Sequence, residues 1–231
     1  MVFGGSVIAP AEPDAGFLHQ VAQRLKQWSR DRALFVVVGG GQPARRAITT
    51  ARAVGVGEEA LDRIGIAATR LNAQTLCAVL RHIGADCNLE VPHTIAQAIR
   101  FAEQHAIVVM GGTEPGHSTD YVAVELAVQG RCARFVNATN VDGVYTRDPS
   151  KHRDARFLPR LSFTEMLQII EEREWTAAGA PGVIDGPSTV LIARHGIPTR
   201  VCNGKDLDNL GRAIAGDDFH GTTVMGEAVA V

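Results

Sequence analysis

Lysine is scarce in this sequence, and long apolar runs are missing. Only three of the 23 basic residues are lysines, and the formal net charge of the 231 residues is −2. Such a balance lacks the strong basic field that attracts nucleic acid or an anionic membrane. A membrane-spanning helix needs about 20 consecutive apolar residues, and no run approaches that length. We therefore expect neither nucleic acid nor a membrane as a partner.

Cysteine is also rare and forms no metal-binding pattern. The four cysteines are Cys77, Cys87, Cys132 and Cys202, without a C-x-x-C pair or zinc-finger spacing. We expect reduced thiols and no metal centre built from protein side chains. The N-terminus lacks a basic start followed by an apolar stretch, which gives no sign of export. These features predict a cytoplasmic protein.

The common phosphate-binding motifs are absent or misplaced. There is no G-x-x-x-x-G-K-S/T sequence, which excludes a Walker-A site. Residues 55–60 nominally fit the dinucleotide fingerprint, but they follow a helical segment, so we interpret them as a turn between helices. With so few lysines, any phosphate chemistry must rely on arginine, backbone N–H groups or a metal.

Apolar runs alternate with helical patterns along the whole chain. Continuous apolar runs at 34–38, 106–110, 132–137 and 198–202 are typical of strands covered on both faces. Apolar residues recur at helical spacing over 17–28 and 61–80, and Thr94 with Gln97 and Ser162 with Glu165 match capping boxes. This alternation predicts an α/β fold, an αβα sandwich with a central, mainly parallel sheet. The polar segment 143–160 is a candidate hairpin at the start of a second lobe.

Three glycine clusters each follow a predicted strand. They are Gly4-Gly5-Ser6, Gly39-Gly40-Gly41 and Gly111-Gly112-Thr113. One such cluster alone would be explained by a tight turn. Ligands of open parallel sheets bind beyond the carboxyl ends of the strands, where glycine lets the backbone approach and helix N-termini attract phosphate. The three clusters together predict one anion-binding pocket along one edge of the sheet.

Charged and aromatic residues near these clusters are candidate ligand contacts. Arg45 lies in the first turns of a helix opened by proline, where it could fork onto a phosphate or remain a solvated surface group. Asp62 could bind a ligand or favour the positive end of its own helix. Asp120 could cap a helix or accept from a ligand, and Tyr145 could stack on a base or pack in the core.

The sequence resembles the amino acid kinase superfamily, and within it the archaeal-type UMP kinases. The resemblance spans nearly the whole chain in the family's order, and the combination of the fourth and fifth stretches is the most specific part. The matching stretches are GGSVIAP at 4–10, VVVGGGQPAR at 36–45, LDRIGIAATRLNA at 61–73, VVMGGTEPGHSTD at 108–120, NATNVDGVYTRDP at 137–149, VID at 183–185 and HGTTV at 220–224.

This resemblance implies a fold and a reaction. It implies one amino acid kinase-like domain over 1–231, with an acceptor-binding lobe at about 1–135 and an ATP-binding lobe at about 136–231. The reaction would be transfer of the γ-phosphoryl group of ATP to UMP, giving UDP and ADP, with Mg²⁺ held mainly by the nucleotide phosphates. The family is usually hexameric and pairs its subunits through the helix at 61–80. The apolar residues on more than one face of that segment agree with burial on both sides, so we expect a homohexamer built from dimers.

The resemblance also implies roles for individual residues. Arg45, Asp142 and Asp185 match positions around the transfer site, where the two carboxylates would orient basic groups or magnesium-bound water. The residues that match the ATP site are Gly5, Ser6, Gly41, Arg45, Thr139, Tyr145 and Asp148. Those that match the UMP site are Gly40, Asp62, Thr113, Glu114, Pro115, Gly116, His117, Ser118 and Thr119, with Asp62 on the ribose and Asp120 closing the loop.

Lysines frequent in the superfamily are missing here, which keeps two alternatives open. Val2 and Phe3 precede the first glycine pair, Gln42 follows the triple glycine, and the stretch around Val190 holds no lysine. One alternative is the same fold with another phosphate or oxyanion acceptor. The other is a storage-like protein that binds nucleotide or oxyanion without transfer. Phosphoryl-transfer activity would separate the kinase from the binding protein.

Overall fold

A single sheet runs through the molecule in a computed structural model that describes residues 1–169 and 183–229. Within these residues, seven strands pair in the order β3-β2-β1-β4-β6-β7-β5. All neighbouring pairs are parallel except β6 and β7, which are antiparallel. The strands are β1 (Val2–Phe3), β2 (Leu34–Val38), β3 (Ile107–Met110), β4 (Phe135–Thr139), β5 (Arg160–Leu161), β6 (Thr199–Asn203) and β7 (Thr222–Val224).

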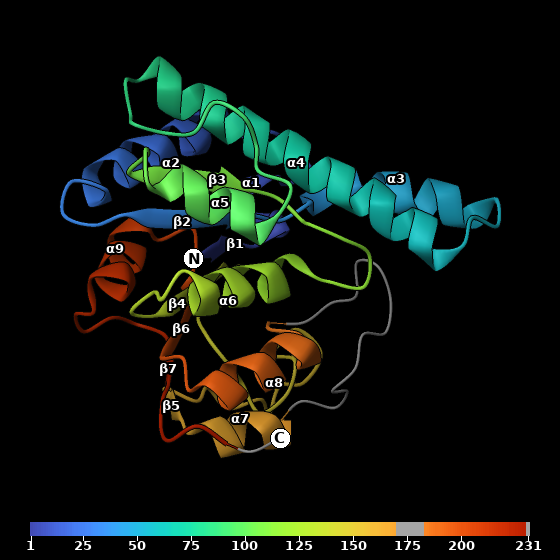
Figure 1. Cartoon of the computed structure of the whole chain (residues 1–231). Coiled ribbons are helices and arrows are strands. Elements are labelled where there is room, and N and C mark those ends of the chain that lie inside the picture. The colour runs from blue at the N-terminus through green and yellow to red at the C-terminus, as the bar shows by residue number, and fades with distance from the viewer. Residues whose placement is uncertain (170–182, 230–231) are drawn as a thin grey trace.

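Helices cover both faces of this sheet (Figure 1). One face carries α2, α4 and α9, and the other carries α5, α6, α7 and α8, as the two main apolar clusters show. This confirms the predicted sandwich. The helices are α1 (Gly5–Ile8), α2 (Ala15–Trp28), α3 (Gly41–Ala53), α4 (Glu58–His82), α5 (Ile95–Ala102), α6 (Thr119–Gln129), α7 (Phe163–Ile169), α8 (Gly186–His195) and α9 (Leu207–Ala215).

The continuous apolar strands contribute side chains to the apolar clusters on both faces of the sheet, because successive side chains point to opposite faces. Val2 belongs to one apolar cluster and its neighbour Phe3 to the other, and both are fully buried. The same alternation continues through β3, where Val108 and Val109 face opposite clusters. A strand buried on both sides needs apolar residues at every position, which explains the runs in the sequence.

Most predicted boundaries are close to the observed ones. The strand predicted at 132–137 lies at 135–139, and the helix predicted from 61 begins at Glu58 after the turn at 55–57. Ser162 and Glu165 bond reciprocally, as a capping box requires. Thr94 accepts from the backbone N–H of Gln97, but the Gln97 side chain accepts from His93 instead of Thr94, so only half of that box forms. No helix of the described part of the chain is long and apolar enough to cross a membrane.

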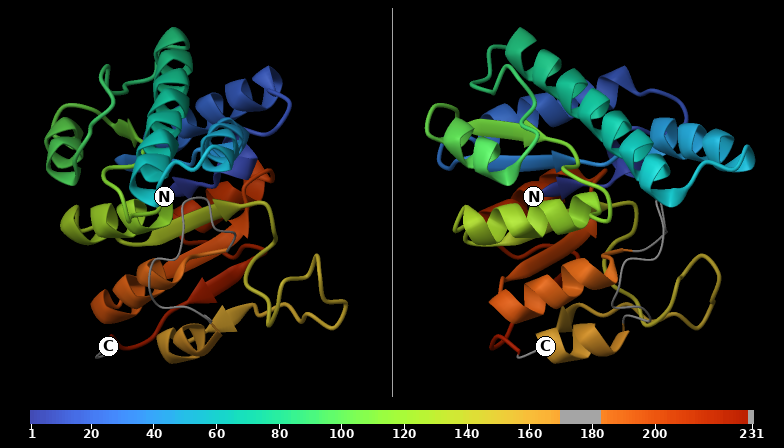
Figure 2. Two further views of the ribbon diagram at one scale, coloured as in Figure 1. Left: turned by 90° about the vertical axis from the view of Figure 1, so that its right-hand side faces the viewer. Right: turned by 45° about the vertical axis from the view of Figure 1, so that its right-hand side comes forward.

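The strand order reverses between β1 and β4. From β1 the chain moves outward through β2 and β3, whereas β4 lies on the other side of β1 and leads to β6. In open parallel sheets such a reversal opens a crevice at the carboxyl ends of the strands, where ligands bind. The loops after β1, β2, β3, β4 and β6 all leave the sheet at this edge, and α3 and α4 extend beyond it as an antiparallel pair (Figure 2).

Candidate functional site

The first two glycine loops touch each other. A Cβ atom added to Gly5 would lie 2.1 Å from the backbone N of Gly41, and one added to Gly39 would lie 2.4 Å from the backbone N of Gly5. Gly41 has a φ of +60°, which disfavours other residues there, and it begins α3. The two loops therefore present backbone rather than side chains, with Ser6 in the short α1 beside them.

Helix α4 holds the second and third glycine loops in place. The side-chain amide of Asn72 donates to the carbonyl oxygens of Gly39 and Gly40, at 2.9 and 3.1 Å. Thr69 Oγ1 accepts from the backbone N–H of Gly112 at 2.7 Å, and the guanidinium of Arg70 donates to the carbonyls of Gly112 and Thr113.

Sequence reasoning gave these three side chains no role. The available signal was a group of three polar residues within four positions, interrupted only by Leu71, in a helical pattern. Such residues need partners when they face the protein interior, and the partners here are the backbones of the ligand loops.

Asp62 contacts the third loop instead of capping its helix. Its Oδ2 accepts from the backbone N–H of Gly116 at 2.8 Å. The capping alternative is wrong because α4 begins at Glu58, with Gly57 as N-cap and two glutamates in its first turn. Asp62 is half-buried one turn further on, where it bonds the loop of residues 113–119. A carboxylate has several lone pairs, so acceptor capacity remains for a ligand hydroxyl.

The rest of the third loop leads into α6. The ring of His117 stacks on that of Tyr121 with centroids 4.2 Å apart, and its Nδ1 lies 3.4 Å from Oε1 of Glu114. Ser118 is the N-cap of α6 and accepts from the backbone N–H of Tyr121 at 3.0 Å. Pro115 and Thr119 are half-buried in the same segment. The structure thus brings all the predicted acceptor residues to one edge of the sheet.

Two carboxylates, Asp120 in the first turn of α6 and Asp185 at the start of α8, interact electrostatically. Asp185 is the N-cap of α8, where it accepts from the backbone N–H of Ser188 at 2.8 Å, and the hydroxyl of Ser118 donates to its other oxygen. Burial and the charge of Asp185 raise the pKa of Asp120 well above its usual value, although a hydrogen bond with Asn137 acts in the opposite direction. The sequence predicts Asp120 as a helix cap or as an acceptor for a ligand group, but the N-cap of α6 is Ser118. The interaction of Asp120 with Asp185 depends on the packing of α6 against α8.

Asp142 lies in a different set of contacts from Asp185. Its Oδ1 accepts from the amide of Asn203 at 3.2 Å, and its Oδ2 lies 3.9 Å from Nε2 of His220. Asn203 ends β6 and His220 precedes β7, so both reach the carboxyl edge from the second half of the sheet. The two predicted transfer-site carboxylates thus belong to two neighbouring clusters.

Tyr145 belongs to a small hairpin that forms an aromatic group. It pairs with Phe157 in an antiparallel bridge, and their ring centroids are 5.5 Å apart. Phe157 also stacks on His220, at 5.4 Å and 23° between planes. A Cβ atom at Gly143 would lie 2.8 Å from the Phe157 ring, so this glycine makes room for it. Residues 144–158 thus form the hairpin predicted within 143–160.

Thr222 fixes this hairpin to the sheet. Its hydroxyl accepts from the backbone N–H of Val144 and donates to the carbonyl of Leu158, at 2.8 and 2.6 Å. Thr139 is buried at the end of β4. Asp148 is on the exposed part of the hairpin, where hydrogen bonds from Ser150 and the nearby Lys151 lower its pKa.

The positions at which lysine is frequent in the superfamily have ordinary structural roles in this chain. Val2 and Phe3 are core residues, Val190 lies in α8, and the side-chain oxygen of Gln42 accepts from Nε of Arg45 at 3.1 Å. Arg45 is exposed in the second turn of α3. In the described part of the chain, no group of three or more histidine, cysteine or acidic residues could hold a metal ion.

Comparison with known proteins shows which family this chain resembles in sequence and fold. The sequence model of the amino acid kinase family matches residues 1–203. The uridylate kinase of Methanobrevibacter smithii is 37% identical over 97% of each chain, and that of Methanothermobacter thermautotrophicus is 41% identical over 98% of each chain. A solved uridylate kinase structure from Archaeoglobus fulgidus has a TM-score of 0.85 and 36% identity, covering 96% of this chain and 98% of that one.

Proposed function

Because this chain belongs to the amino acid kinase family, we propose that it is a uridylate kinase that transfers the γ-phosphoryl group of ATP to UMP and gives UDP and ADP. Its similarity to uridylate kinases extends over 97–98% of the chain. The structural observation that carries the proposal is the bond from Gly116 to Asp62, because it brings a carboxylate with spare acceptor capacity to the acceptor loop.

The acceptor occupies the first lobe, at about 1–135, in this proposal. Gly40 and the 113–119 loop surround the UMP, and Asp62 accepts from its ribose hydroxyls. A pocket sized for a single pyrimidine ring excludes purines by steric clash. A hydroxyl that pairs with a partly buried carboxylate also favours ribose over deoxyribose, since its absence leaves the carboxylate without that partner.

The ATP occupies the second lobe, at about 136–231, with its phosphates at the first two glycine loops. Gly5, Ser6 and Gly41 provide close backbone approach, and Arg45 neutralises phosphate charge. Thr139, Tyr145 and Asp148 surround the adenine nucleotide. The strand reversal between β1 and β4 supports one shared crevice, with the loops after β1, β2 and β3 on one side and those after β4 and β6 on the other.

Phosphoryl transfer demands positioning and charge neutralisation more than covalent chemistry. The acceptor phosphate is already anionic, so no strong general base is required. Mg²⁺ held mainly by the nucleotide phosphates supplies further neutralisation when bound. Burial and the charge of Asp185 both raise the pKa of Asp120, and a nearby cation would offset both effects by stabilising the carboxylate. Asp142 orients its own neighbours, Asn203 and His220.

We also propose a cytoplasmic homohexamer built from dimers. Leu71 on the solvent-facing side of α4 is 62% exposed, and an exposed leucine there suits a subunit contact. The four cysteines are free thiols in the structure, as in proteins of a reducing compartment. Neither alternative acceptor chemistry nor a storage role is favoured, because the full-length relatives are uridylate kinases.

The direct test is an acceptor panel with ATP and Mg²⁺ in which ADP release is measured. We expect turnover with UMP and much less with dUMP, AMP and GMP. Equal ADP release with every monophosphate would remove the acceptor assignment. No release with any of them, together with tight nucleotide binding, would revive the storage-like alternative.

A further inference from the structure

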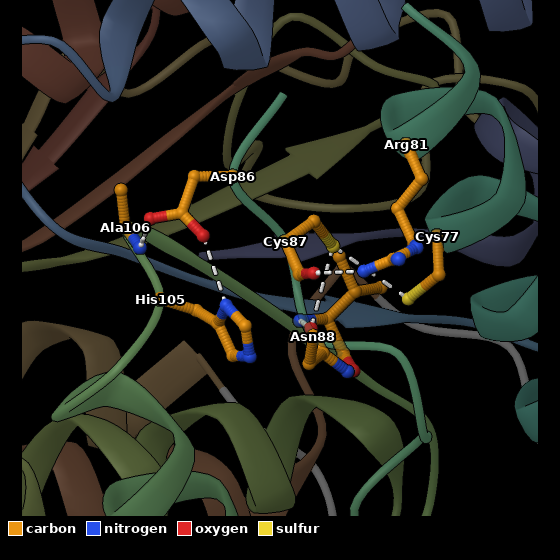
Figure 3. A network of polar contacts seen from close by, with 8 residues as sticks. Cys77, Arg81, Asp86, Cys87, Asn88, His105 and Ala106 are labelled. Atoms are coloured by element: carbon orange, nitrogen blue, oxygen red, sulfur yellow. Dashed lines mark hydrogen bonds and ion pairs between the residues drawn. The ribbon is translucent and has the colours of Figure 1, made fainter. Parts of the chain in front are cut away.

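Two of the four cysteines, Cys77 and Cys87, lie next to each other in the interior (Figure 3). The Sγ atoms of Cys77 and Cys87 are 3.8 Å apart, and the exposed fractions of the two residues are 0% and 1%. Cys77 belongs to α4, whereas Cys87 pairs with Ile107 at the start of β3. The pair therefore spans the contact between α4 and the edge of the sheet.

The backbone on both sides of Cys87 is fixed to the sheet edge. Asp86 accepts from the backbone N–H of Ala106 and contacts Nδ1 of His105, both at 2.9 Å. The buried Asn88 accepts from the backbone N–H of Val109 at 2.7 Å and donates to its carbonyl at 3.0 Å. Cys87 is thus held opposite Cys77 by a frame that does not depend on the thiols.

The two thiols have different electrostatic surroundings. The S–H of Cys87 donates to Cys77 and lowers the pKa of Cys77, and the charge of Arg81, one turn along α4, acts in the same direction. The same contact raises the pKa of Cys87. By contrast, burial, with a further contribution from the charge of Asp206, raises the pKa of Cys202 to about 12. Cys77 is therefore the better nucleophile of the pair.

We propose that Cys77 and Cys87 form a reversible disulfide when hydrogen peroxide enters the interior. The thiolate of Cys77 attacks one peroxide oxygen, the O–O bond breaks, and a sulfenic acid forms while the other oxygen leaves as water after taking up a proton. The sulfur of Cys87 then attacks Sγ of Cys77, the S–O bond breaks, and a second water leaves. Two thiols and one peroxide give one disulfide and two waters, and a dithiol reverses the change.

The step requires little movement of the chain. The sulfurs must approach by about 1.8 Å to reach the S–S bond length. Because Cys87 is fixed to the sheet edge, the bond would join α4 covalently to that edge. Asn72 and Arg70, which hold the glycine loops, lie on the same helix. The disulfide would therefore fix the helix that supports the acceptor loops.

Peptide mapping of the native wild-type chain tests this proposal. The folded protein is treated with hydrogen peroxide, the remaining thiols are alkylated, and the digest is analysed by mass spectrometry. Met225, which is 57% exposed, reports in the same sample that the oxidant was sufficient. We expect a peptide joining Cys77 to Cys87, with a loss of two hydrogens, that dithiothreitol removes.

Two results of this mapping would overturn the proposed disulfide. If Met225 becomes a sulfoxide while Cys77 and Cys87 remain alkylatable, or if they become sulfinic acids without a link, the thiols are only packing groups. This mapping uses the wild-type chain, so it stands even where a variant folds poorly.

Matched variants provide the second measurement. Cys77→Ala and Cys87→Ala should each abolish the link, whereas Cys202→Ala, a change at another buried cysteine, should keep it. Peroxide should raise the melting temperature of the wild type and of Cys202→Ala by several degrees, and dithiothreitol should reverse the rise. A rise of the same size in Cys77→Ala would contradict the proposal.

Discussion

Arg45 is exposed, and it lies on α3 close to the first two glycine loops. Within the described residues its side chain donates to Gln42, on the preceding turn of the same helix, so little structure depends on it. Arg45→Ala should lower turnover at least tenfold, equivalent to about 1.4 kcal/mol of transition-state stabilisation. The melting temperature should stay within about one degree. Steady-state kinetics checks the first value and thermal unfolding the second.

The neighbouring Arg46 is a matched control for this prediction. It is also exposed on α3, but it points in a different direction around the helix. Arg46→Ala should retain most of the activity. Equal losses in the two variants would indicate a general charge effect, and wild-type turnover in Arg45→Ala would remove Arg45 from the site.

Asp62 should determine the preference for ribose. Asp62→Asn keeps an oxygen that can accept from Gly116, so the loop stays in place while the charge is lost. The preference for UMP over dUMP should shrink by about 1–3 kcal/mol, measured as the ratio of kcat/KM values. Glu59→Gln, a change one turn earlier at an exposed residue paired with Arg63, should leave this ratio unchanged. An unchanged ratio in Asp62→Asn would remove its ribose role.

We expect the carboxylate of Asp120 to lower the stability of the folded protein at neutral pH and to support its activity. Its pKa is raised in the folded protein by burial and by Asp185, so the folded state binds the proton more tightly than the unfolded state. Stability should therefore fall as the pH rises from the unfolded pKa toward the higher folded one. Asp120→Asn should melt at a higher temperature than the wild type at pH 7–8 and lose this advantage below about pH 4. Its turnover should fall.

Thermal unfolding across this pH range checks the sign of the effect. Asp148→Asn is a suitable control because hydrogen bonds lower the pKa of that exposed carboxylate. The variant should not gain stability at neutral pH. An Asp120→Asn protein that melts below the wild type at pH 7–8 would show that the carboxylate stabilises the fold.

At the scale of elements, the hairpin of residues 144–158 should form part of the ATP site. Phe157→Ala removes the ring that lies between Tyr145 and His220. Aromatic contacts of this kind contribute about 0.5–1.5 kcal/mol, so the KM for ATP should rise about fivefold with the KM for UMP unchanged. Phe219→Ala, which removes a ring stacked under Arg200 instead, is the control. Equal rises in both KM values would indicate a general structural effect.

The elements themselves were largely predictable, because their signals are local. The 34–38 strand and the Ser162–Glu165 capping box follow from adjacent residues alone. Boundaries such as the start of α4 at Glu58 were less predictable, because glutamates in the turn before Leu61 carry no apolar periodicity. The roles of Thr69, Arg70 and Asn72 could not be derived, since their partners are 32–43 residues away.

For the whole molecule, assembly should depend on α4. Leu71→Asp puts a charge on the exposed side of this helix, where a subunit contact would have to bury it at high cost. The oligomer should therefore dissociate, as measured by light scattering at micromolar concentration. Leu89→Asp, at a leucine that is 61% exposed outside the helices, should leave the mass unchanged. A monomeric wild type would contradict the proposed assembly.

The sequence by itself determined the fold class, the family and the three glycine loops. Periodicity and short motifs are properties of neighbouring residues, and they survive without knowledge of distant contacts. Only the folded chain brings Asp62 to the loop at 113–119, puts Asp120 within the electrostatic influence of Asp185, and sets Cys77 against Cys87. Each of these contacts arises from the packing of separate elements around the sheet, so none is determined by local sequence.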